Sequence, residues 1–331
     1  MNSDDDQFLY RSEGGSFSVG SDNEDHTSTL IKVNENLLCI TRKNISTILL
    51  ADDIDPDRSN PKIRHNVQHI LPYGSDHEFV GKTLQLASVL FKEHSLMKSI
   101  DCGKGLSIAF SFLKEITSLE KVKNEYLVEE KATNSKVTSR DSLSQIPSLP
   151  NLEQKVKGFV TNSDHAMKSV MEMAHLFYPA IIGKGWEGRL LQEIESTFPA
   201  EESFVEFTRQ LKGFTELIRN IRNKIEHPHG ELKEYIFTIE NYKLTPTNTL
   251  NPPFVSFTGK DYNLPKMQVS NFMDSTVSNL LIIFELLMVY LSNLRAESFG
   301  EDKRIVVEVP ENERGEAEKH VRFRYEILWK S

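Results

Sequence analysis

The sequence predicts a mainly α protein with a smaller β component, an α+β fold whose second half is a helical bundle with a β insertion. Seven apolar residues between Phe204 and Ile225 recur at alternating spacings of three and four, which is the seam of one amphipathic helix. Residues 266–295 are long and apolar enough for a buried helix. Residues 321–329 alternate between apolar and polar side chains over most of their length, which is typical of a strand in a β-hairpin.

The chain has 331 residues, which is long enough for two domains. A shift toward Ser, Thr, Lys, Asn and Pro between Glu129 and Lys155 marks the best boundary between them. We expect an acidic disordered tail, a mostly helical N-terminal domain, a linker, a helical domain with a β insertion, and a β-hairpin packed on the C-terminal domain. In that order these segments are 1–28, 29–130, 131–155, 156–298 (insertion 233–258) and 299–331.

The net charge is −9, and most of it lies in the first 28 residues. That segment holds seven acidic residues and one arginine, so it accounts for −6 of the total. The rest of the chain is only slightly acidic, which neither excludes nor indicates a nucleic-acid partner. Few apolar residues anchor the segment, and we expect it to be disordered.

The N-terminal domain is predicted to contain two helices and a turn-rich segment. Leu30–Leu50 mixes apolar and polar residues and leaves helix and strand open. Asp52–Pro61 is rich in turn-forming residues. Ser75–Glu78 has the pattern of a capping box, which predicts a helix that continues to about Met97. Helical spacing of apolar residues predicts a second helix over Leu106–Val128.

The second half is predicted to contain four helices, two strands and a terminal hairpin. The helices are expected over residues 163–181, 189–196, 202–227 and 266–295, the strands over 233–239 and 254–257, and the hairpin over 304–309 and 320–329. On the second hairpin strand, five alternating residues should face a core: Val321, Phe323, Tyr325, Ile327 and Trp329.

The sequence predicts a cytoplasmic protein that does not enter a membrane. The longest apolar run, Leu280–Leu291, is interrupted by Glu285 and is shorter than the roughly 18 residues of a membrane span. No basic and then apolar leader follows Met1. Two widely separated cysteines, Cys39 and Cys102, fit a reducing compartment.

Chemically suggestive residues gather at the end of the predicted helix 202–227. Arg219, Arg222 and Glu226 are neighbours on one flank of the apolar seam, and an Arg222–Glu226 ion pair is the simplest expectation. His227 precedes Pro228, which disfavours helical geometry at the histidine, so the helix should end there. Arginine holds phosphate oxygens with its planar guanidinium, and histidine moves protons near neutral pH. This combination suits an RNA phosphodiester.

Arg222 and His227 do not lie on the same face of an ideal helix. Arg222 and His227 are five residues apart, which on an ideal helix separates them by about 140° around the axis. Unwinding at Pro228 is needed to bring the imidazole back toward the arginine.

The stretch Arg222-Asn223-Lys224-Ile225-Glu226-His227 resembles the signature of the HEPN superfamily, an arginine and a polar residue followed by a histidine at a helix end. The resemblance covers about residues 156–298 and implies a four-helix bundle that forms a homodimer, with both protomers' motifs facing a shared cleft. It implies a metal-independent endoribonuclease that uses the RNA 2′-hydroxyl as nucleophile and leaves a cyclic phosphate. Such proteins often act as toxins or in anti-phage defence, and some are inactive binding or dimerisation modules.

Three other pairs fit the loose spacing of this signature, namely Arg58–His65, Arg64–His69 and Arg314–His320. Only the pair Arg222–His227 ends a long amphipathic helix and is followed by proline.

The resemblance also implies roles for individual residues. His227 is the expected general base or acid, Arg222 stabilises the charge on the phosphorane, and Asn223 orients the motif or the phosphate. Arg219 extends the basic patch, and Glu226 orients its neighbours or balances charge. His229 is an alternative to His227.

Two function hypotheses follow from the sequence. The first is an RNA-cleaving enzyme, without metal or cofactor, whose further partner is an antitoxin or a defence-system protein. The second is a non-catalytic dimerisation or binding module for a phosphate-bearing or protein partner. A hydrolase site within residues 29–128 is a third alternative. A zinc site at His65 and His69 would need both on a helix and lacks an evident third ligand.

Overall fold

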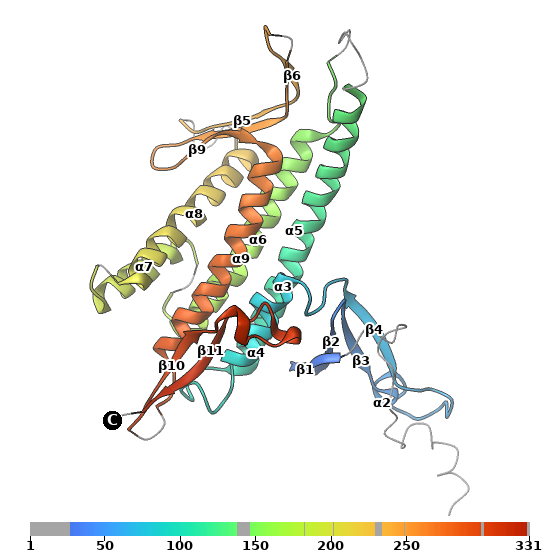
Figure 1. Cartoon of the computed structure of the whole chain (residues 1–331), viewed down its shortest axis with the longest axis vertical. Coiled ribbons are helices and arrows are strands. Elements are labelled where there is room, and N and C mark those ends of the chain that lie inside the picture. Colours follow the sequence, from blue (N-terminus) through green and yellow to red (C-terminus); the bar gives the residue numbers. More distant parts are fainter. Residues whose placement is uncertain are drawn as a thin grey trace, which may run out of the picture. The chain divides into compact units, whose positions relative to one another are not determined.

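The computed structural model describes residues 27–137, 146–181, 183–200, 202–228, 234–247, 249–298 and 301–329 (Figure 1). The chain divides into two compact units. Unit 1 comprises residues 1–113 and 292–331, and unit 2 comprises residues 114–291. The predicted acidic tail lies outside the described residues, apart from its last two, which begin the first strand.

Unit 1 begins with a four-stranded antiparallel sheet in the order β1-β2-β3-β4, so the prediction of a mostly helical N-terminal domain is wrong. Its strands are β1 (Thr27–Val33), β2 (Asn36–Thr41), β3 (Ile45–Leu49) and β4 (Asn66–Leu71). A two-residue turn joins β1 to β2, and Asn34 adopts a positive φ of 53° there, which asparagine tolerates better than most residues.

The burial of this sheet explains why its sequence left helix and strand open. In β1 the buried residues Ile31 and Val33 alternate with exposed Leu30 and Lys32. In β2 and β3, four successive residues are buried, because both faces are covered. A strand buried on both faces loses the alternation that distinguishes it from a helix.

Short helices follow the sheet. They are α2 (Ala51–Ile54), α3 (Glu78–Val80), the π-helical turn η2 (Gly81–Gln85) and α4 (Leu86–Leu90). The predicted capping box is not formed, because His77 rather than Ser75 is the N-cap, and its Nδ1 accepts a hydrogen bond from the Phe79 amide at 3.3 Å. The helix ends at Leu90 rather than near Met97.

The C-terminal hairpin consists of β10 (Lys303–Glu308) and β11 (Phe323–Leu328), joined by a loop with two 3₁₀ turns, η3 (Glu311–Glu313) and η4 (Glu316–Glu318). Its pairing is antiparallel. The predicted alternation along β11 is observed, although Trp329 is 71% exposed and does not join the buried face. The hairpin belongs to unit 1, where the Tyr325 hydroxyl donates to the Leu90 carbonyl at 3.1 Å, and not to the C-terminal domain assigned from sequence.

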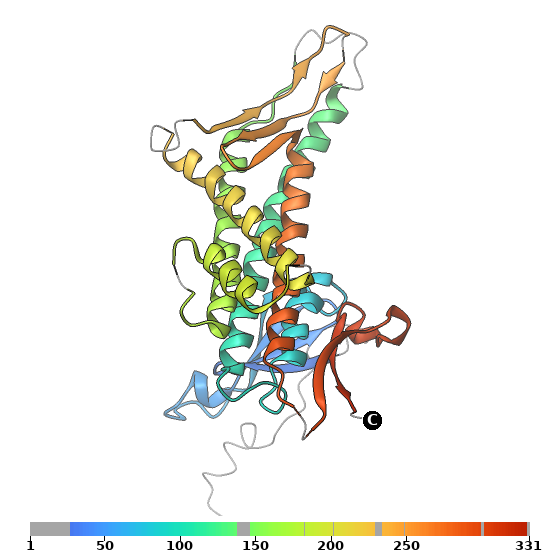
Figure 2. The same ribbon diagram turned by 90° about the vertical axis from the view of Figure 1, so that its left-hand side faces the viewer.

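Helices α5 to α9 supply the helical part of unit 2. They are α5 (Cys102–Val137), α6 (Leu152–Phe177), α7 (Trp186–Thr197), α8 (Ser203–Glu226) and α9 (Val269–Leu294). The first residues of α5 and the last of α9 belong to unit 1. Within unit 2, α6, α8 and α9 lie side by side in both ribbon views (Figures 1 and 2).

Helix α9 lies against three other helices of unit 2. Phe272 meets Phe159 of α6 edge to face, with ring centroids 6.0 Å apart. Tyr290 stacks on Phe204 of α8 at 4.7 Å. Asp274 pairs with Lys123 of α5 at 3.0 Å. By length and composition α9 would suffice to cross a membrane, and 56% of its most apolar window is buried inside the protein. The sequence had assigned this stretch to a buried helix.

A three-stranded antiparallel sheet connects α8 to α9, in the order β5-β8-β9. Its strands are β5 (Ile236–Glu240), β8 (Phe254–Thr258) and β9 (Asn263–Gln268). A small ladder of β6 (Lys243–Leu244) and β7 (Leu250–Asn251) extends from it. The sequence predicted β5 and β8 but not β9, whose last residues had been assigned to the start of the following helix.

The predicted fold class is therefore corrected. The described residues form an α+β mix, about 52% helical, with 11 strands in four small antiparallel sheets, and they show no clear HEPN-type four-helix bundle. One physical reason is the length of α5, which continues to Val137 and adds a further long helix to unit 2. Much of the expected linker 131–155 is thus helical at its two ends, and residues 138–145 between them lie outside the described part.

Candidate functional site

Helix α8 ends where the sequence predicted. Glu226 is its last residue, and His227 leaves helical geometry with φ −127° and ψ 64°. The His227 amide still donates to the Asn223 carbonyl at 2.8 Å, and Lys224 Nζ donates to the Pro228 carbonyl at 3.0 Å. These bonds hold the turn after the helix, and the imidazole of His227 is exposed.

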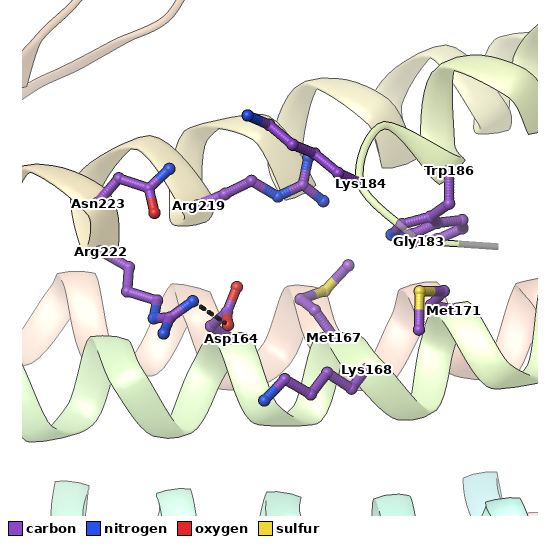
Figure 3. Close-up of a pocket in the computed structure, with 10 residues that line it drawn as sticks. All are labelled: Asp164, Met167, Lys168, Met171, Gly183, Lys184, Trp186, Arg219, Arg222 and Asn223. Atoms are coloured by element: carbon purple, nitrogen blue, oxygen red, sulfur yellow. Dashed lines mark ion pairs between the residues drawn. The ribbon is translucent and has the colours of Figure 1, made fainter. Parts of the chain in front are cut away.

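Arg222 makes two ion pairs. Its Nε lies 3.0 Å from Oε1 of Glu226, which is the pair expected from the i, i+4 spacing. Its Nη1 lies 3.1 Å from Oδ2 of Asp164 on α6, a partner that the sequence did not reveal (Figure 3). Arg222 therefore joins α8 to α6.

Arg219 pairs with a buried carboxylate. Its guanidinium contacts Glu187 of α7 through two hydrogen bonds of 2.5 and 3.1 Å. Glu187 is only 1% exposed, whereas the Arg219 side chain is 22% exposed. Burial opposes the charge of Arg219, but the hydrogen bonds and attraction of Glu187 outweigh it and raise the arginine pKa. This contact fixes α7 against α8.

A pocket of about 410 Å³ lies between α6, α8 and the turn that opens α7 (Figure 3). Arg219, Arg222 and Asn223 line it from α8, and Asp164, Met167, Lys168 and Met171 line it from α6. Gly183, Lys184 and Trp186 complete it from the preceding turn and the start of α7. Three of the predicted site residues are thus brought together in one pocket.

His227 is not among the residues that line this pocket. Within one chain this pocket therefore brings Arg222 together with Asn223 and Arg219 but not with His227. Glu226 takes part by pairing with Arg222, whereas His229 lies outside the described residues.

The pocket holds three polar groups that are available to a ligand. Lys168 and Lys184 are exposed, and within the described ranges neither ammonium has a carboxylate partner. The side-chain amide of Asn223 likewise has no hydrogen-bond partner among the described residues. Met167, Met171 and Trp186 supply an apolar wall beside them.

Sequence reasoning missed the contribution of α6. Asp164 and Lys168 are four residues apart, as are Met167 and Met171, so all four lie on one face of the helix. That spacing can be read from the sequence. The position of this face relative to α8 cannot, because only the tertiary packing of α6 and α8 brings it opposite Arg222.

The alternative zinc arrangement is not formed. His65 precedes β4 and its Nδ1 accepts from the Ala51 amide at 3.0 Å, whereas His69 lies in β4 beside Ser46 Oγ at 2.9 Å. No group of three or more His, Cys, Asp or Glu side chains suited to a metal ion occurs in the part of the chain that the structure describes.

Three comparisons with known proteins, against family models, curated proteins and solved structures, each find no match to this chain.

Proposed function

We propose that unit 2 binds RNA by holding a backbone phosphate in the pocket between α6 and α8. One observation carries this proposal: Lys168, Lys184 and the amide of Asn223 line the same pocket as Arg222, and their side-chain donors have no partner among the described residues. Ammonium, guanidinium and amide donors are the groups that bind phosphate oxygens in proteins. The volume of about 410 Å³ is within the usual range for a small-ligand site, so one nucleotide unit is a reasonable occupant.

The charge of the pocket favours a phosphodiester. Four cations line the pocket, Lys168, Lys184, Arg219 and Arg222, and three carboxylates form ion pairs with its two arginines, Asp164, Glu187 and Glu226. These seven residues together carry one net positive charge. A backbone phosphodiester carries a single negative charge, whereas a terminal phosphate carries nearly two at neutral pH. The apolar wall of Met167, Met171 and Trp186 offers a surface for a sugar or base.

Binding is expected to weaken when the pocket cations are removed. Arg222→Ala should reduce the affinity for a fluorescent single-stranded RNA by roughly tenfold or more, because a charge-assisted hydrogen bond is lost. Lys168→Ala should weaken binding less and lower the slope of log affinity against log salt by about one. The measurement is fluorescence anisotropy at several salt concentrations.

Lys121→Ala provides a matched control, because Lys121 is an exposed lysine of α5 that does not line the pocket. It removes the same charge from unit 2. Equal losses in Lys121→Ala and Lys168→Ala would show that binding depends on general charge and not on this pocket.

A second candidate function is metal-independent RNA cleavage in a homodimer. The observation in its favour is the exposed imidazole of His227, four residues beyond Asn223 and free of helical geometry. Because His227 does not line the pocket of its own chain, the proposal places it opposite a second copy's arginines. One His227 imidazole would take the proton of the 2′-hydroxyl while its oxygen attacks phosphorus, and the protonated His227 of the second copy would give a proton to the leaving 5′-oxygen. A 2′,3′-cyclic phosphate and a 5′-hydroxyl would form. A toxin or anti-phage role, with an antitoxin or defence-system partner, extends this candidate.

Cleavage is tested with purified protein, RNA and EDTA. His227→Ala should lower the cleavage rate by at least a hundredfold, because proton transfer contributes factors of this size. His165→Ala, which removes an exposed histidine of α6, should leave the rate unchanged. Undiminished cleavage by His227→Ala would exclude the assignment, and binding without cleavage by the wild type would leave RNA binding as the function.

A further inference from the structure

We propose that Asp164 is a specificity-determining residue that accepts a hydrogen bond from the ribose 2′-hydroxyl, so that the pocket selects RNA over DNA. This inference rests on the proposed binding of a nucleic-acid phosphate at the same pocket. It adds a role that neither the position of Arg222 nor the residues at the end of α8 predict.

The carboxylate of Asp164 lies inside the proposed phosphate site. Asp164 lines the pocket among Lys168, Arg219 and Arg222, and its side chain is 13% exposed (Figure 3). A negative charge there repels the phosphate that its cationic neighbours attract. A site for phosphate alone would bind it more tightly without this carboxylate. We therefore expect the carboxylate to contact another part of the ligand.

The two oxygens of Asp164 have different surroundings. Oδ2 lies 3.1 Å from Nη1 of Arg222, which fixes the orientation of the carboxylate. For Oδ1, no hydrogen bond is present among the described residues, and the charge of Arg219 also attracts this carboxylate. An ionised carboxylate has only acceptor capacity, so this oxygen is matched to a donor on the ligand.

A ribose hydroxyl fits that donor. In an RNA chain the 2′-hydroxyl stands on the carbon next to the one that bears the 3′-phosphate oxygen. A phosphate held by Arg222 and Lys168 therefore carries a hydroxyl donor within one sugar carbon of itself. DNA has the same phosphate and lacks this hydroxyl, which is the group by which proteins distinguish the two polymers.

A purely structural role for Asp164 makes a different prediction. If the carboxylate only orients Arg222, its replacement changes the affinity for RNA and DNA by the same factor. If it accepts the 2′-hydroxyl, its replacement changes the ratio of the two affinities. The ratio is therefore the deciding quantity, and it is insensitive to a general loss of folded protein.

The experiment measures the binding of three oligonucleotides of one sequence by the full chain: RNA, DNA and 2′-O-methyl RNA. The wild type should bind RNA roughly tenfold or more tightly than DNA, because a hydrogen bond to a charged acceptor is lost. The 2′-O-methyl strand should resemble DNA, since its 2′-oxygen cannot donate. In Asp164→Ala the RNA and DNA affinities should become equal within about twofold.

A second variant keeps the shape of the side chain. Asp164→Asn removes the repulsive charge, so it should bind both polymers more tightly than the wild type while the RNA preference narrows. Glu172→Ala, which removes an exposed acidic residue of α6 that does not line the pocket, should retain the wild-type ratio.

The outcomes separate the two proposals. Equal binding of RNA and DNA by the wild type, or a preserved preference in both Asp164 variants, overturns the role of Asp164 and leaves phosphate binding intact. Failure of the wild type to bind either polymer overturns phosphate binding and this inference with it.

Discussion

Replacing Arg219 with methionine is expected to lower the free energy of unfolding of unit 2 by about 3 kcal/mol. The substitution leaves the carboxylate of Glu187, which is 1% exposed, without the two hydrogen bonds that satisfy it. A buried carboxylate that loses its partner costs several kcal/mol, far more than the net value of the pair. Because the pair joins α7 to α8, the wall of the pocket formed by the start of α7 should loosen as well, and RNA affinity should fall with stability.

The measurement is urea unfolding followed by tryptophan fluorescence. Trp186 is buried next to Glu187 in the chain and reports on this region, whereas Trp329 is largely exposed and should change little on unfolding. A second variant, Glu187→Leu with Arg219→Met, removes both charges and should recover part of the loss, because an apolar pair leaves no charge buried.

Arg209→Met is the matched control for this prediction. Arg209 also lies on α8 and pairs with Glu195 of α7 at 2.9 Å, but both side chains are substantially exposed. An exposed pair contributes at most about 1 kcal/mol. A loss in Arg219→Met no larger than that in Arg209→Met would contradict the importance assigned to the buried pair.

Replacing Phe272 with alanine is expected to cost about 3–5 kcal/mol, because it removes a buried aromatic ring and leaves a cavity. Phe272 is 2% exposed near the start of α9 and meets Phe159 of α6 edge to face. Neither ring lines the pocket, so the variant tests the helical core rather than the ligand site.

The corresponding control is Ile282→Ala on the same helix. Ile282 is 42% exposed, and its truncation should change the free energy of unfolding by less than about 1 kcal/mol. Thermal unfolding of both variants beside the wild type gives the comparison. Similar unfolding temperatures for the two variants would show that α9 does not have the buried position described for its Phe272 face.

The sequence predicted an element well when the pattern that defines it lies within that element. Helix α8 was predicted over 202–227 and is observed over Ser203–Glu226, because its apolar seam repeats regularly and Pro228 ends it. Helix α6 begins at Leu152, eleven residues earlier than predicted. The prediction missed these first turns because polar residues and the exposed Gly158 stand between their buried residues. Polar residues on the exposed side of a long helix resemble a linker when the packing partner is not known.

The strands of the N-terminal sheet have no local pattern that predicts them. Residues 45–48 are buried on both faces of a four-stranded sheet, so their pattern depends on the layers that cover it and not on a local period of two. No arrangement of neighbouring residues indicates that Ile45 will face Leu71 in the adjacent strand. Strand pairing of this kind is decided by contacts between distant segments.

The candidate site contains both features that depend on a local sequence pattern and contacts between distant segments. The amphipathic helix α8, its end at His227 and the Arg222–Glu226 pair were predictable from the sequence, because all three depend on residues within one or two turns. Three other features of the site were not predictable: Asp164 pairs with Arg222, Glu187 pairs with Arg219, and His227 does not line the pocket. Those relations depend on how α6 and α7 pack against α8, and the charges that define a binding site act across such contacts, whatever the order of residues along the chain.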